Sequence, residues 1–211
     1  RRHTRSFHVT GVQTCALPIF NGGWDLKNAL LNLHDFHLRF GLVFEYIEQP
    51  CIELSDLGKL KAEIPMKIAV DESIRKSLDS DFSNLKEYAD IAILKWQPIG
   101  GIEKAISLTK EIGLPVVISS ALETGIGLSH GLALASALDV TSSCGLATAT
   151  LLESDIVMED LSIINGEIEV LSRTPNQGLI EKYRAPEDRK VWWLERIKRI
   201  IDSGGFDEFL N

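Results

Sequence analysis

The chain has 211 residues, of which 45% are hydrophobic and 25% are charged, and its formal net charge is −8. This composition is typical of a soluble globular domain and excludes a disordered chain. The acidic balance argues against a nucleic-acid partner, and no uncharged apolar run reaches the ~18 residues of a membrane span. Cys15, Cys51 and Cys144 are widely spaced and form no CxxC pair. They therefore favour free thiols in a reducing, cytoplasmic compartment over disulfides or a structural zinc site.

Residues 1–19 differ from the rest of the chain. They are basic whereas the remainder is acidic, and they show neither helical nor strand periodicity. They also lack the apolar core and cleavage site of a signal peptide. The string GVQTCALPI resembles translated sequencing-adapter sequence. We therefore expect 1–19 to be a disordered, artefactual leader on an N-terminally truncated chain; a genuine disordered leader is the alternative.

From Phe20 onward, helical and strand patterns alternate. Apolar residues recur every three or four positions over 25–40, which predicts a helix that ends at Gly41. Further helices are predicted over 55–63, 80–88, 102–112, 125–138 and 186–202, and strands over 42–47, 66–70, 91–94, 116–118 and around position 144. The Asn-Gly pair in SIINGEIEV (162–170) predicts a hairpin. Strands that alternate with helices indicate an α/β fold with a parallel sheet.

A polar residue follows each of four predicted strands at a regular interval. Glu48, Asp71, Lys95 and Ser119 are separated by 23, 24 and 24 residues. A regular βα unit is typical of a barrel, whose active site forms at the C-terminal strand ends; a doubly wound open sheet would not need a polar group at every strand end. Two neighbouring carboxylates suit Mg²⁺, although a third oxygen ligand is usual. Taken singly, each charge could be a helix cap or a solvated side chain, but their common phase favours a site.

Four strings carry a family resemblance: YIEQP (46–50), IAVDES (68–73), ILKWQPIGG (93–101) and VISSALETGIGL (117–128). They resemble the enolase superfamily, within it the muconate-lactonizing-enzyme subgroup, and most closely the o-succinylbenzoate synthase family. The resemblance implies a partial (β/α)7β TIM-type barrel over 20–170, lacking the N-terminal capping domain and the first barrel strands. It implies that 171–211 pack back towards that capping domain.

The resemblance also implies a metal centre and a catalytic lysine. Members of the family hold Mg²⁺ with three acidic ligands, of which Glu48 and Asp71 carry over, whereas Ile19 stands where the third is expected. Lys95 is implied as a catalytic residue that faces the family's acid/base lysine across the substrate. That second lysine belongs to a Lys-x-Lys motif, which this chain does not show before Asn21.

Other positions are implied to support substrate and ligands. The succinyl tail of the substrate would meet Ser119, Ser120 and the backbone near Gly145 and Leu146. Asn21 and Glu72 would lie behind the metal ligands, and Glu72 would hold the lysines in place. Lys59 and Lys61 repeat the Lys-x-Lys string, but we expect them on the solvated face of a helix.

The implied activity is a carbon–oxygen lyase reaction. It is the Mg²⁺-dependent dehydration of 2-succinyl-6-hydroxy-2,4-cyclohexadiene-1-carboxylate to 2-succinylbenzoate in menaquinone or phylloquinone biosynthesis. The alternatives are an N-succinylamino acid racemase, which needs both flanking lysines as bases, and a non-catalytic barrel remnant. The expected partner is a small-molecule carboxylate, with no nucleic acid and no membrane, and the oligomeric state is left open. Because the base and one metal ligand are missing, we expect the 211-residue chain itself to be inactive.

Overall fold

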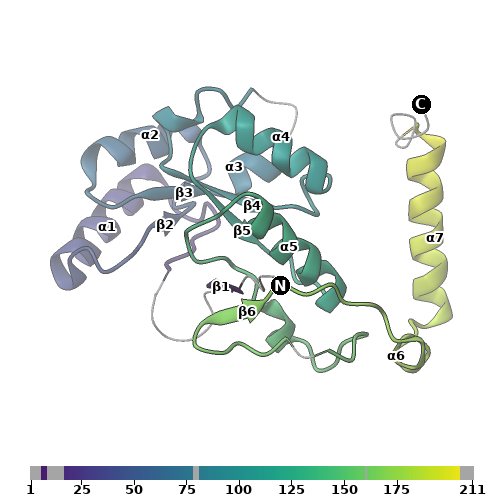
Figure 1. Cartoon of the computed structure of the whole chain (residues 1–211). Helices are drawn as coiled ribbons and strands as arrows, with labels where there is room; N and C mark the ends of the chain where they lie inside the picture. Colours follow the sequence, from purple (N-terminus) through teal and green to yellow (C-terminus); the bar gives the residue numbers. More distant parts are fainter. Residues whose placement is uncertain (1–5, 9–16, 78–80, 160, 205–211) are drawn as a thin grey trace.

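The computed structural model describes residues 6–8, 17–77, 81–159 and 161–204 (Figure 1). In chain order its strands and helices, with the 3-10 turns η1 and η2, are β1 (Ser6–His8), α1 (Leu26–Phe40), β2 (Ile47–Glu48), α2 (Leu54–Glu63), β3 (Ile68–Val70), α3 (Glu72–Arg75), η1 (Leu85–Glu87), β4 (Ile91–Lys95), α4 (Ile102–Ile112), β5 (Val116–Ser119), α5 (Gly125–Ala137), η2 (Thr148–Leu151), β6 (Glu167–Glu169), α6 (Gln177–Lys182) and α7 (Glu187–Asp202).

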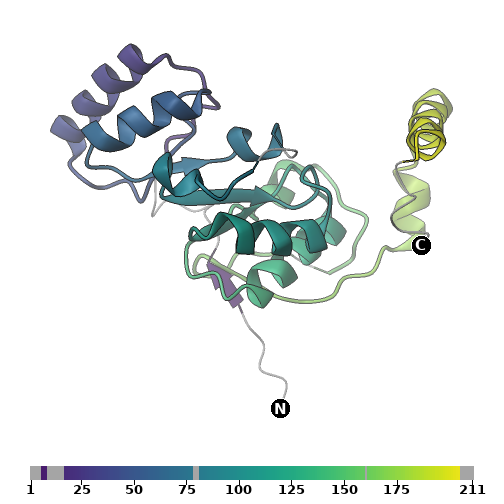
Figure 2. The same cartoon turned by 90° about the horizontal axis from the view of Figure 1, so that it is seen from above.

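The central sheet is parallel, and its strands lie in sequence order, β2-β3-β4-β5. Single parallel bridges extend it at both edges, from Ile19 to Glu48 and from Ser119 to Gly145. Helices connect successive strands, and α1 and α2 lie side by side at one end (Figure 2). Sequential parallel strands with helical crossovers are the arrangement of a (β/α) barrel. The predicted α/β fold, a partial barrel, is confirmed.

Both faces of this sheet are buried, as in parallel sheets generally. Alternate strand residues join the large core that includes the buried helix residues, for example Ile68 and Val70 of β3. The residues between them form a second cluster on the opposite, inner face: Tyr46, Ala69, Ile91, Ile93 and Val117. Side chains of a strand point alternately to the two faces, so this division follows directly from the strand period.

Local sequence signals account for several element ends. Asp25 caps α1 by accepting a hydrogen bond from the backbone N–H of Asn28 at 2.8 Å, and Gly41 ends the helix with a φ of 64°. Asn165 and Gly166 both have positive φ, which a two-residue type I′ hairpin turn requires. Helix α4 has the predicted bounds, 102–112.

Other elements differ from the prediction. The strand predicted over 42–47 is reduced to Ile47–Glu48, and Leu42 and Val43 are exposed, because only the last residues of this run reach a neighbouring strand. In place of the helix predicted over 80–88 the structure has η1; 78–80 lie outside the described residues.

The leader region also differs from the expected disorder where it is described. Strand β1 pairs antiparallel with β6, and the backbone N–H of Glu48 donates to the carbonyl of Pro18 at 2.9 Å. The edges of β6 and β2 supply backbone partners for these segments. Residues 1–5 and 9–16, with Cys15, lie outside the described residues, whereas Cys51 and Cys144 are buried free thiols.

Helix α7 stands away from the sheet in both views (Figures 1 and 2). It has no buried residue among those described, and Trp192 and Trp193 are exposed. Within the described segments, no helix combines the length and hydropathy needed to cross a bilayer.

Candidate active site

The inner face of the sheet changes from apolar to polar at the C-terminal strand ends. Four inner apolar residues are each followed, two positions later, by a polar residue. The pairs are Tyr46 and Glu48, Ala69 and Asp71, Ile93 and Lys95, and Val117 and Ser119. Because the side-chain period of a strand is two, the polar residues continue the inner series on four adjacent strands. The regular spacing in the sequence therefore corresponds to one polar mouth on the inner side of the sheet.

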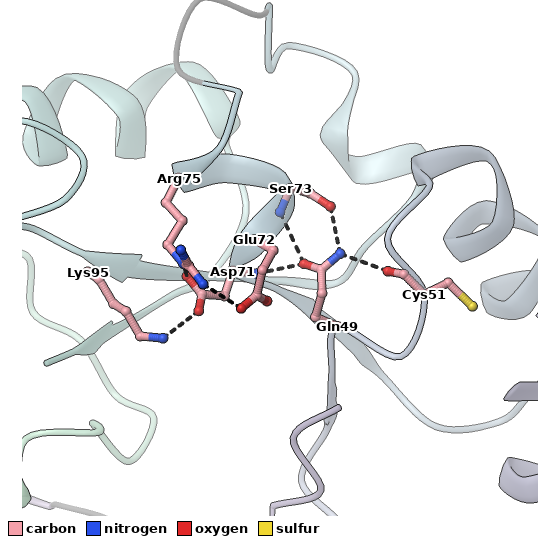
Figure 3. Close-up of polar contacts among 7 residues, drawn as sticks. All are labelled: Gln49, Cys51, Asp71, Glu72, Ser73, Arg75 and Lys95. Atoms are coloured by element: carbon pink, nitrogen blue, oxygen red, sulfur yellow. Dashed lines mark hydrogen bonds and ion pairs between the residues drawn. The ribbon is translucent and has the colours of Figure 1, made fainter. Parts of the chain in front are cut away.

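Asp71 is the centre of a network of charges (Figure 3). It is completely buried, and its carboxylate accepts hydrogen bonds from Arg75 Nε, at 3.1 Å, and from Lys95 Nζ. Arg75 also donates to Glu72 at 2.7 Å. Arg75 was not predicted from the sequence, although its position three and four residues after the two acids on a helical turn is a spacing that favours ion pairs.

Glu48 is 5% exposed. Burial raises its pKa from 4.5 to about 7. The negative charges of Asp71 and Glu72 raise this pKa further, whereas Lys95 and Arg75 oppose the rise. A carboxyl group with this pKa is poised to exchange a proton near neutral pH.

Gln49 links the strand ends that carry Glu48 and Asp71 (Figure 3). Its buried amide bonds the backbone N–H of Asp71 and two groups of Ser73, as well as the carbonyl of Cys51. Sequence reasoning missed this residue, because a glutamine beside a proline carries no pattern of its own.

The serines after β5 have different surroundings. Ser119 is half-buried, and a Cβ added to Gly145 would lie 2.5 Å from its Oγ, so this glycine makes room for the hydroxyl. Ser120 is 6% exposed, and its Oγ lies 2.5 Å from Thr148 Oγ1 and accepts the N–H of Leu122. Of the two serines predicted to meet substrate, Ser119 is therefore the more available.

The backbone predicted to meet substrate is largely engaged in strand pairing. Gly145 donates its N–H to the carbonyl of Ile118 and accepts the N–H of Ser120, each at 2.9 Å. The side chain of Leu146 is fully buried in the core. Thr148, which the sequence analysis did not single out, is instead the partner of Ser120.

The two predicted supporting residues, Asn21 and Glu72, have different surroundings. Asn21 is exposed, in a turn with a φ of 51°. Glu72 is 2% exposed and bonds Arg75, whereas Lys95 bonds Asp71. From the sequence resemblance we expect Glu72 to hold the lysine. In the structure Glu72 pairs with Arg75 instead, because the helical turn places Arg75 next to it.

The side chains present do not fit the complete Mg²⁺ site that the sequence resemblance implies. Both carboxylate oxygens of Asp71 are engaged by cations. Ile19 lies beside Glu48 in the sheet, where the third ligand is expected, and has no donor atom. In the described part of the chain, no group of three or more His, Cys, Asp or Glu side chains is placed to hold a metal ion.

Comparison with known proteins gives one consistent result. Residues 20–179 match the family described as Enolase C-terminal domain-like. The chain is 37% identical over 179 residues to an o-succinylbenzoate synthase of Mycobacterium tuberculosis. This alignment covers 84% of this chain and 54% of that protein. The chain is also 43% identical over 153 residues to the o-succinylbenzoate synthase of Thermobifida fusca. That alignment covers 71% of this chain and 47% of the relative. The chain thus spans about half the length of these relatives.

Solved structures share the fold. Muconate cycloisomerase from Pseudomonas fluorescens aligns with a TM-score of 0.70 and 22% identity over 82% of this chain and 50% of that chain. The L-Ala-D/L-Glu epimerase from Bacillus subtilis aligns with a TM-score of 0.66 and 23% identity. This alignment covers 79% of this chain and 47% of the epimerase chain. At these identities the likeness concerns architecture alone.

Proposed function

Because the chain belongs to the enolase superfamily, matching its C-terminal domain over residues 20–179, we propose that it carries the barrel part of an o-succinylbenzoate synthase. The observation that supports this best is the set of charged side chains, Glu48, Asp71 and Lys95, on the inner side of adjacent strand ends. The identity of 37–43% to o-succinylbenzoate synthases favours this activity over others on the same barrel.

The proposed reaction removes water from 2-succinyl-6-hydroxy-2,4-cyclohexadiene-1-carboxylate. The C–H bond next to the carboxylate and the C–O bond of the hydroxyl break, a ring double bond forms, and 2-succinylbenzoate and water leave. Negative charge develops on the carboxylate after proton removal, so a fixed cation nearby lowers the barrier.

Lys95 is the residue of this chain that would supply such a charge. Its ammonium is paired with the buried Asp71, which directs it to the inner side of the sheet. From there it would stabilise the ring anion by charge and by contact with the π face. The neutral hydroxyl of Ser119 on the adjacent strand would receive the succinyl carboxylate.

Further parts of the proposal rest on the same family resemblance. They are the lyase class, a place in menaquinone biosynthesis, a cytoplasmic location and a small-molecule carboxylate as partner, with neither nucleic acid nor membrane. Use of Mg²⁺ is proposed only for a chain with a carboxylate at position 19. With Ile19, and without a Lys-x-Lys motif before Asn21, the 211-residue chain is expected to show no turnover.

Product binding tests the proposal without requiring turnover. Calorimetric titration with 2-succinylbenzoate should show saturable binding, and Lys95→Ala should weaken it by about tenfold or more, since a charge-assisted hydrogen bond contributes ~1.5–3 kcal/mol. The matched control is Lys110→Ala, an exposed lysine of α4, which should leave the affinity unchanged. Absence of binding, or equal binding by both variants, would contradict the proposal.

A further inference from the structure

The side chain of Gln49 uses its whole hydrogen-bonding capacity between two strand ends. It is completely buried. Its Nε2 donates to the carbonyl of Cys51 at 2.9 Å and to Ser73 Oγ at 2.7 Å. Its Oε1 accepts the backbone N–H groups of Asp71 at 3.0 Å and Ser73 at 3.2 Å. An amide has two N–H donors and two lone pairs, so no capacity remains for another partner.

The backbone of Gln49 is held in an unusual conformation. Its φ is +40°, a region that residues other than glycine adopt at a cost of ~1–3 kcal/mol and that clusters at functional sites. Its N–H donates to the carbonyl of Ala69 at 2.9 Å, and its carbonyl accepts the N–H of Gly22 at 2.7 Å. The surrounding structure thus fixes the residue that directly follows Glu48.

These contacts join the two acids of the candidate site. Gln49 is covalently linked to Glu48 and hydrogen-bonded to the backbone of Asp71, and Asp71 in turn holds Lys95. An amide is required here: a carboxylate of the same shape would lose both donors and add a negative charge near Asp71 and Glu72 (Figure 3).

We propose that Gln49 is a positioning residue, which sets the placement of Asp71, and through it of the Lys95 ammonium, relative to Glu48. The functional consequence rests on the function proposed above, whereas the geometric consequence does not. Gln49 touches neither substrate nor reacting atoms in this role; it acts through Asp71.

The test compares Gln49→Glu with the unchanged chain by two measurements. In protein labelled with ¹³C-lysine, the side-chain ε-CH₂ resonance of Lys95, assigned with Lys95→Arg, should shift in Gln49→Glu because its carboxylate partner moves. The affinity for 2-succinylbenzoate should fall by at least about tenfold. The control is Lys61→Met, which removes hydrogen bonds to the carbonyls of Lys86 and Ala89, outside the Gln49 network, and should leave both measurements unchanged.

An unchanged Lys95 resonance in folded Gln49→Glu would overturn the proposal. If that variant does not fold, Ser73→Ala replaces it, because it removes one of the four partners; a smaller shift of the same resonance is expected, and none would overturn the proposal. If the unchanged chain binds no 2-succinylbenzoate, the proposed function fails, while the Lys95 resonance still decides the role of Gln49.

Discussion

At the scale of single residues, the candidate site is a cluster of three buried carboxylates and two half-buried cations. The carboxylates of Glu48, Asp71 and Glu72 lie close to the cations of Arg75 and Lys95. Arg75 and Lys95 pair with Asp71 and Glu72, which leaves Glu48 as the acid whose charge is least compensated. Burial then raises its pKa to about 7.

This shift predicts a pH-dependent stability in metal-free buffer. Between pH 4.5, the ordinary pKa of glutamate, and about 7 the folded chain binds a proton at Glu48 that the unfolded chain has released. The free energy of unfolding should therefore fall as pH rises through this window, by a contribution on the order of 3 kcal/mol, and level off above it. Glu48→Gln should remove this component in denaturant titrations at several pH values, whereas Glu63→Gln, on the exposed end of α2, should retain it. Equal slopes for both variants would refute the shift.

At the scale of elements, Lys61 ties α2 to the segment before β4. Its ammonium donates to the carbonyls of Lys86 at 2.8 Å and Ala89 at 2.7 Å and pairs with Asp90 at 2.9 Å. Asp90 also accepts the N–H of Ile68 in β3 at 3.0 Å. The sequence-based expectation of a solvated helix face is wrong for Lys61, because the partners come from residues more than twenty positions away.

Lys61→Met should lower the free energy of unfolding by ~1–3 kcal/mol, since it removes the donor to two carbonyls and the cation that pairs with Asp90. Lys59→Met is the matched control on the same helix: the side chain of Lys59 is 60% exposed and pairs with Asp56 one turn away, so its loss should change stability by less than ~0.5 kcal/mol. Urea unfolding of both variants measures the difference, and equal values would show that the three contacts of Lys61 contribute nothing net.

At the scale of the whole molecule, α7 carries large apolar side chains that no other part of the described chain covers. The exposed residues are Val191, Trp192, Trp193, Leu194, Ile197, Ile200 and Ile201. An exposed apolar face of this kind favours association, while the sheet and its helices keep their own core without it. Among the described residues, the sheet and its helices thus form a folded core to which α7 contributes no buried side chain.

Ending the chain at residue 185 should accordingly change Tm by less than about 2 °C, because no buried residue of α7 is removed. Sedimentation at increasing protein concentration should show less self-association than for the full 211 residues. A fall in Tm of more than about 5 °C would mean that α7 packs on the core in solution.

Much of this architecture could be predicted from the sequence, because it depends on local periodicity and on glycine. The bounds of α4 follow from its apolar spacing, and the Asn165-Gly166 turn follows from residues that tolerate positive φ. The 23- and 24-residue spacing placed Glu48, Asp71 and Lys95 at one edge, since parallel strands of a regular βα unit end on the same side.

Only the tertiary structure decided which side chains are partners. Arg75 rather than Lys95 bonds Glu72, Ser120 is hydrogen-bonded to Thr148, and Gln49 joins two strand ends. The contacts of Gln49 and Ser120 depend on how side chains from segments more than twenty residues apart point toward each other. The contact of Glu72 depends on which of two cations the helical turn places beside it. Because local patterns encode the face of an element but not the neighbour that meets it, the charge network of the site had to be read from the folded chain.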